Sequence, residues 1–119
     1  MGTLNAIGCV ALDAALGLHF EAGWEWVEER VLENARMIAD GLEAMGLRRF
    51  GSADPDHASG IVTVEVPEPE ALHAHLQSQN IHLSLRDRKL RFAPHAYNTE
   101  EEIGAVLEAC RDCLSEVIT

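Results

Sequence analysis

Residues 90–103 read LRFAPHAYNTEEEI, and this stretch contains the strongest structural signals in the 119-residue chain. Its first apolar residues alternate with Arg91, which predicts a β-strand with one buried face. Thr99 and Glu102 have the spacing of a capping box, and consecutive glutamates favour the positive N-terminal end of a helix. The stretch therefore predicts a strand, a short connection and a helix that closes the chain.

The segments before this stretch predict further strands and one more helix. Apolar and polar residues alternate through residues 81–92 around a turn at 87–88, which indicates a β-hairpin. The β-branched run at 61–66 predicts a strand, and 47–50 is a shorter strand candidate. Prolines end the run at 61–66 and open a helix that extends to about residue 79. The middle of the chain is therefore predicted to supply most of a sheet.

Two helices are predicted at the start of the chain, on either side of Gly23. Residues 24–45 have apolar positions at three- and four-residue spacing, and Gly46 is placed to end that helix. Residues 6–20 form an alanine-rich helix that is more apolar than a solvent-exposed helix should be. We therefore expect this first helix to need a partner.

These elements together predict an α+β fold. We expect a small mixed or antiparallel sheet of about four strands with helices on one face, preceded by two N-terminal helices. The length suits a single domain, 1–119. Within it, 1–22 is interpreted as an interdomain or interface helix and 23–119 as the α+β small domain.

Composition excludes several classes of partner. Asp and Glu outnumber Lys and Arg by 20 to 9, giving a net charge of −11, so nucleic acid is not expected to bind. No run approaches the about 20 apolar residues that a membrane span needs, and no secretory signal is recognisable. Three cysteines fit a reducing compartment, so we predict a cytoplasmic protein. Cys110 and Cys113 are interpreted as buried structural cysteines rather than a zinc half-site, and no metal ligands are predicted.

Two segments resemble class V aminotransferases. Residues 90–103 are similar to the C-terminal signature of that family, in which an arginine precedes Tyr-Asn-Thr and an acidic helix start. Gly2-Thr3-x-Asn5, followed by the alanine-rich helix, resembles the family's Gly-Thr-x-Asn segment. The resemblance implies the C-terminal small domain of a dimeric, pyridoxal-phosphate (PLP) dependent enzyme of the cysteine desulfurase and isopenicillin N epimerase-like superfamily.

The resemblance also implies roles for two residues. Arg91 matches the arginine that binds the α-carboxylate of the amino-acid substrate, and Thr3 matches the threonine that reaches the PLP phosphate of the neighbouring subunit. The family's Schiff-base lysine lies upstream, in the large domain, whereas Lys89 is the only lysine here and lies beside a hairpin turn. We therefore predict a fragment or remnant that has no catalytic residue, binds no PLP alone and is inactive alone. The hairpin also lacks the loop cysteine of desulfurases, so persulfide chemistry is not expected.

Other interpretations remain open at this point. Arg91 has the position of an ordinary surface charge on a strand, and His95 shares its face. Tyr97 is expected to pack its ring at the end of the strand, and Trp24 and Trp26 are expected to be packing or interface residues. Alternatively, the domain is non-catalytic and associates through its first helix with a large-domain chain or a second copy, or it is a carboxylate-binding module that uses Arg91.

Overall fold

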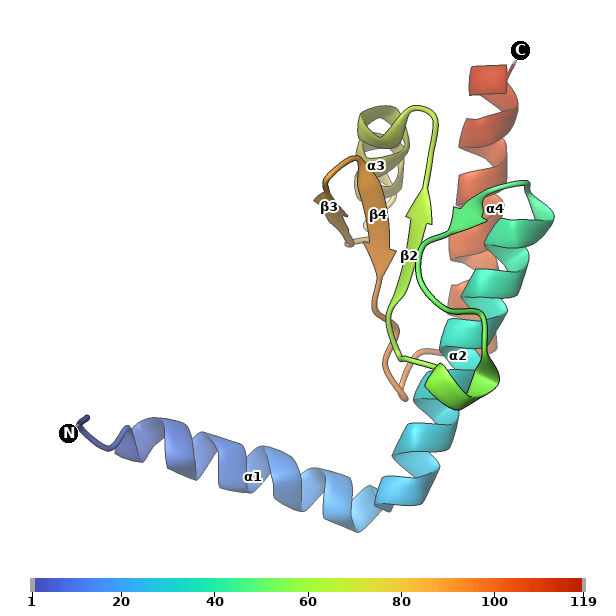
Figure 1. Cartoon of the computed structure of the whole chain (residues 1–119). Helices are drawn as coiled ribbons and strands as arrows, with labels where there is room; N and C mark the ends of the chain where they lie inside the picture. The colour runs from blue at the N-terminus through green and yellow to red at the C-terminus, as the bar shows by residue number, and fades with distance from the viewer. Residues whose placement is uncertain (1, 119) are drawn as a thin grey trace.

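The computed structural model describes residues 2–118, and within them it contains an antiparallel sheet and helices that cover one of its faces (Figure 1). The helices are α1 (Ala6–Ala22), α2 (Trp24–Ala44), α3 (Pro69–Ser78) and α4 (Glu100–Ile118), the strands are β1 (Arg48–Arg49), β2 (Val62–Glu65), β3 (Ser84–Arg86) and β4 (Lys89–Phe92), and a short 3-10 turn, η1 (Pro55–His57), follows β1. The predicted α+β class is confirmed.

The sheet has the strand order β1-β2-β4-β3, and every neighbouring pair is antiparallel. Val62 pairs with Phe92 and Val64 with Leu90, and these four side chains are buried on the face that the helices cover. Alternate residues therefore point to the opposite face, which no helix of α2–α4 covers. This second face is called the open face below.

The hairpin between β3 and β4 forms as predicted, but it begins later than the alternation suggested. Asp87 and Arg88 have φ of 48° and 62°, the left-handed pair of a two-residue turn that matches strand twist. The strand starts at Ser84 rather than Ile81, because the backbone N–H of Ile81 donates to Leu76 O at 3.0 Å and closes the end of α3. The same α3 end places Asn80 at a φ of 61°.

The core lies between the sheet and α2, α3 and α4. α2 and α4 pack against each other, and α3 packs on α4 and on the β3–β4 side of the sheet. The largest fully buried apolar side chains come from the sheet, α2 and α3: Leu42, Val64, Leu72, Leu76 and Leu90. Residues 24–116 therefore share one hydrophobic core.

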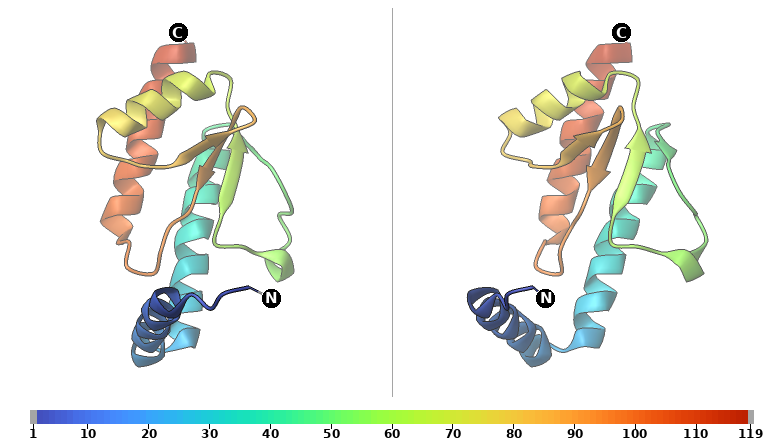
Figure 2. Two further views of the ribbon diagram at one scale, coloured as in Figure 1. Left: turned by 90° about the vertical axis from the view of Figure 1, so that its left-hand side faces the viewer. Right: turned by 60° about the vertical axis from the view of Figure 1, so that its left-hand side comes forward.

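α1 lies outside that core. None of its residues is buried, and it meets α2 at a bend of 87° next to Gly23, whose φ is 94°. In the left view of Figure 2 the strands lie in front of α2 and α4, and α1 points toward the viewer, so α1 extends on the side of the open face. The radius of gyration is 16.8 Å, above the about 13.5 Å of a compact domain of this length, because of this projection.

No single described helix is both long and apolar enough to cross a membrane. α1 and α2 reach the required length and composition only as a bent pair.

The cysteines differ in accessibility, which gives a first prediction. Cys9 is exposed on α1, whereas Cys110 and Cys113 are buried, as expected for structural cysteines, and burial raises the pKa of Cys110 to about 12. We expect iodoacetamide at pH 8 to modify Cys9 alone in the folded chain, because the thiolate is the reactive form. Mass spectrometry after proteolysis measures this, and modification of Cys110 at the rate of Cys9 would contradict the buried position.

The same shift has a consequence for stability. The pKa of Cys110 rises from an ordinary 9.0, so its contribution to folding is complete below pH 9 and declines as the pH increases toward 12.

Candidate functional site

Arg91 lies on the open face of the sheet, opposite its buried neighbours in β4. It is directly across from Thr63 of β2 and Ser84 of β3, and its Nη2 donates to the Ser84 hydroxyl at 3.4 Å. The side chain is half-buried and, within residues 2–118, makes no ion pair. A guanidinium in this state retains most of its donors for an anionic ligand.

The open face is basic although the chain is acidic. The register places Arg48, Arg86, Lys89 and Arg91 on it, with Glu65 as the acidic member. Salt bridges of the described residues involve none of these four cations. The open face is therefore suited to bind an anion.

Thr3 is not brought near Arg91 within this chain. It lies before α1, is exposed, and precedes Asn5, whose side chain caps α1 by accepting from Gly8 N at 2.9 Å. The N-terminus lies at the outer end of α1, away from the sheet (Figure 1). The role of Thr3 at the PLP phosphate of a neighbouring subunit stays a prediction.

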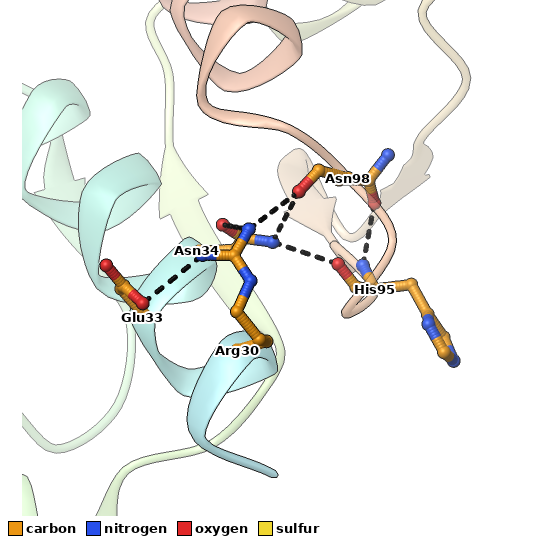
Figure 3. Close-up of polar contacts among 5 residues, drawn as sticks. All are labelled: Arg30, Glu33, Asn34, His95 and Asn98. Atoms are coloured by element: carbon orange, nitrogen blue, oxygen red, sulfur yellow. Dashed lines mark hydrogen bonds and ion pairs between the residues drawn. The ribbon is translucent and has the colours of Figure 1, made fainter. Parts of the chain in front are cut away.

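A tight turn at residues 95–98 follows β4 and is closed by Asn98 (Figure 3). The backbone N–H of Asn98 donates to His95 O at 3.1 Å, and Asn98 Oδ1 accepts from His95 N at 2.7 Å. Thr99 then caps α4 by accepting from Glu102 N at 3.1 Å, as predicted from its spacing. The Asn98 amide donates to the Glu102 carboxylate at 3.1 Å, and this contact lowers the pKa of Glu102.

Two residues of α2 anchor this turn, and the sequence analysis did not identify them. Asn34 is fully buried, and its Nδ2 donates to His95 O at 2.9 Å and to Asn98 O at 3.1 Å. Arg30 Nη2 also donates to Asn98 O at 3.1 Å, while its Nη1 pairs with Glu33 at 3.2 Å (Figure 3). One signal was present: Asn34 occurs on the apolar stripe of α2, where a polar side chain requires partners.

The ring of His95 points away from this network (Figure 3) and belongs to a cluster of aromatic rings that includes residues of α1 and α2. It stacks on Tyr97 at 4.6 Å between centroids and meets His19 edge-on at 5.9 Å, and His19 stacks on Trp24 at 4.8 Å. The sequence places His95 and Arg91 on one face, but the ring of His95 contacts His19 and Tyr97 and not Arg91.

Tyr97 corrects the sequence prediction. It is predicted to pack at the end of the strand, but the residue is 75% exposed because the turn buries Ala96 and directs Tyr97 outward. With His95 and Trp26 it borders a small apolar pocket of about 170 Å³. That volume suits one side chain rather than a whole cofactor. Trp24 and Trp26 are half-exposed at this corner, and their predicted interface role stays a prediction.

A larger hollow of about 810 Å³ lies between α2 and residues 49–63. Its half-buried cation, Arg49, already pairs with Glu43 at 2.7 Å and Asp40 at 3.8 Å. Convergent free groups distinguish a binding site from a surface hollow, and here the principal cation is neutralised. The open face is therefore the stronger candidate.

Residues 2–118 contain no group of three or more metal-ligating side chains. His73 and His75, the closest histidine pair in the sequence, contact Leu83 O and Gln79 respectively.

No family model matches this sequence, and no curated protein matches it. Solved structures do. A cysteine desulfurase from Thermococcus onnurineus NA1 superposes with a TM-score of 0.88 at 20% identity, over 97% of this chain and 32% of its own. This chain has the fold of one part of a cysteine desulfurase. A NifS-like protein gives a TM-score of 0.79 at 22% identity, over 98% of this chain and 35% of its own.

A PLP-bound enzyme also matches most of this chain. A serine palmitoyltransferase from S. paucimobilis with bound PLP-myriocin aldimine matches with a TM-score of 0.61 at 26% identity, over 75% of this chain and 24% of its own. The chain spans about a third of the desulfurase and NifS-like chains. The predicted resemblance to this enzyme group is thus confirmed for the fold, including α1, because the two desulfurase-type matches cover nearly the whole chain.

Proposed function

We propose that these residues are the small domain of a class V aminotransferase-like, PLP-dependent enzyme that acts on an amino acid. The observation that carries the proposal is Arg91 on the open face, unpaired and oriented by Ser84, in a fold that matches part of a cysteine desulfurase. In this proposal Arg91 binds the substrate α-carboxylate. Its planar guanidinium suits the two oxygens of a carboxylate.

We propose that these residues do not form a PLP site by themselves. A Schiff base needs a lysine in an enclosed site, and the single lysine of the chain, Lys89, lies on the open face. In this proposal the lysine belongs to a large domain, Thr3 reaches the phosphate in a neighbouring subunit, and the 119 residues alone are inactive. PLP then supplies the electron-withdrawing chemistry in the assembled enzyme.

α1 supports an assembly of this kind. Exposed apolar side chains line it on several sides: Ile7, Val10, Leu12, Leu16, Leu18 and Phe20. A helix that is apolar all round is stable in water only when another surface covers it. We infer that residues 1–22 pack on the large domain or on a second copy, with 23–119 as the folded small domain. The unpaired cysteines support a reducing location such as the cytoplasm.

A binding experiment tests the role of Arg91. Titration of the ¹⁵N-labelled chain with L-alanine, followed by amide NMR shifts, should show weak saturable binding centred on residues 84–91. Arg91→Gln should reduce the affinity about tenfold or more, because a charge-assisted contact to the carboxylate is lost. Arg111→Gln, which removes an equal charge from an exposed position on α4, should have no effect. Equal binding by the Arg91 and Arg111 variants would contradict the proposal.

The exposed α1 favours a second candidate, a non-catalytic domain that acts by association. The two candidates differ in what they bind. An association domain binds another protein surface through α1, whereas the first candidate binds a carboxylate through Arg91. Loss of L-alanine binding in Arg91→Gln supports the enzyme-derived site or a carboxylate-binding module over association alone.

A further inference from the structure

The ammonium group of Lys89 is held on the open face by an aromatic ring. Its Nζ lies 4.8 Å from the ring centroid of Phe50, within the range of a cation–π interaction. Phe50 continues the pairing of β1, because its backbone N–H donates to Thr63 O at 2.9 Å. Lys89 therefore reaches across β2 and does not extend freely into solvent.

Lys89 and Arg91 are neighbouring cations, and each is held by a different uncharged side chain. They are two residues apart on one strand and on one face, so their backbones lie about 7 Å apart. Ser84 holds Arg91 and Phe50 holds Lys89, and the described residues give neither cation an ion pair. Glu65 is opposite Lys89 in the register, but the Lys89 Nζ contacts the Phe50 ring and Asp87 O instead.

We propose that Lys89 forms a second anion subsite beside Arg91, and that the substrate is an amino acid whose side chain carries a carboxylate. This inference rests on the proposed function, in which Arg91 binds the α-carboxylate. In such a substrate the two carboxyl carbons are separated by about 5 Å when four C–C bonds are extended. Arg91 is directed toward Ser84 of β3 and Lys89 toward Phe50 beyond β2, so an extended substrate would lie across β4 with one carboxylate near each cation.

Charge argues against other occupants of the open face. Two copies that met symmetrically through this face would place like cations opposite each other, which is repulsive. Nucleic acid is opposed by the net charge of −11. A small dianion matches Lys89 and Arg91, the two of the four open-face cations that uncharged side chains hold in place, and it does not bring a polyanion close to the acidic helices. An acidic protein surface remains a different class of ligand, and the experiment below includes it.

The test compares two amino acids of nearly equal size. The ¹⁵N-labelled chain is titrated with L-glutamate and with L-glutamine at one ionic strength, and affinities come from amide shifts. L-glutamate should bind about fivefold more tightly, the scale of one half-exposed ionic contact. Lys89→Met keeps the side-chain stem and should lower the ratio to about 1 while leaving the L-glutamine affinity within about twofold. Arg111→Gln should preserve the ratio.

The outcomes separate this inference from the proposed function. Equal affinities for the two amino acids in the unmodified chain, with both lost in Arg91→Gln, would overturn the second subsite and leave the carboxylate anchor intact. Indifference of both affinities to Arg91→Gln would overturn both. Binding of a polyglutamate peptide through Lys89 and Arg91, without a preference for free L-glutamate, would assign the face to an acidic protein and overturn the substrate. Phe50→Leu should reduce the preference for L-glutamate, because Phe50 positions Lys89. Attraction by the positive charge of the open face alone predicts no such effect.

Discussion

Asn34→Ala is expected to lower the free energy of unfolding by about 2–4 kcal/mol. Asn34 is fully buried, and its amide donates to the carbonyls of both His95 and Asn98. After removal of the amide, Asn98 N still donates to His95 O and Arg30 to Asn98 O, so each carbonyl keeps one donor and loses a second. The cost is therefore that of two lost hydrogen bonds in a buried place, together with the cavity that the shorter side chain leaves. Urea denaturation followed by tryptophan fluorescence measures the change.

The same substitution should loosen the turn at residues 95–98, which Asn34 connects to α2. Amide hydrogen exchange in that turn should become faster through local opening, without global unfolding. Exchange in β2 should change only as much as the free energy of global unfolding changes. Asn34→Asp is expected to have a larger effect, because a carboxylate has no donor for two carbonyl oxygens and is costly to bury. Glu28→Ala, an exposed position on the same helix, is the matched control and should change stability by less than about 0.5 kcal/mol. A cost for Asn34→Ala as small as that of Glu28→Ala would show that the turn is held by other contacts.

The backbone arrangement could be predicted because local signals agree with one another. Alternation specified β4 and the face of Arg91, and the pairing of Thr99 with Glu102 specified the start of α4. Strand ends were less predictable, since residues 47, 61 and 66 satisfy a strand pattern but lie outside the paired segments. Pairing depends on where the partner strand ends, which the sequence of one segment does not contain.

The details of the site could not be predicted for a related reason. Asn34 and His95 are 61 residues apart, and no local pattern indicates that one holds the other. Tyr97 looked like a packed ring because aromatic residues usually are, but the turn closed by Asn98 directs it outward. The cation–π contact of Lys89 with Phe50 likewise depends on the strand order, in which β1 and β4 lie on either side of β2. Side-chain placement across strands therefore required the structure.

Leu42→Ala is expected to destabilise the chain by about 2–5 kcal/mol, whereas Leu12→Ala should change its stability by less than about 0.5 kcal/mol. Leu42 is a fully buried residue of α2 that packs in the hydrophobic core, so its truncation to alanine leaves a cavity that the neighbouring side chains fill only in part. Leu12 is 58% exposed on α1, where alanine is also a slightly better helix former. Thermal and urea unfolding of both variants measure the contrast.

This contrast tests the division of the chain more directly than either variant alone. If residues 23–119 fold as a unit and α1 is reserved for another surface, a leucine on α1 contributes to association and not to folding. Leu12→Ala should then weaken self-association or large-domain binding in sedimentation velocity while the unfolding transition stays unchanged. A large stability cost for Leu12→Ala in the monomer would mean that α1 packs on its own body instead.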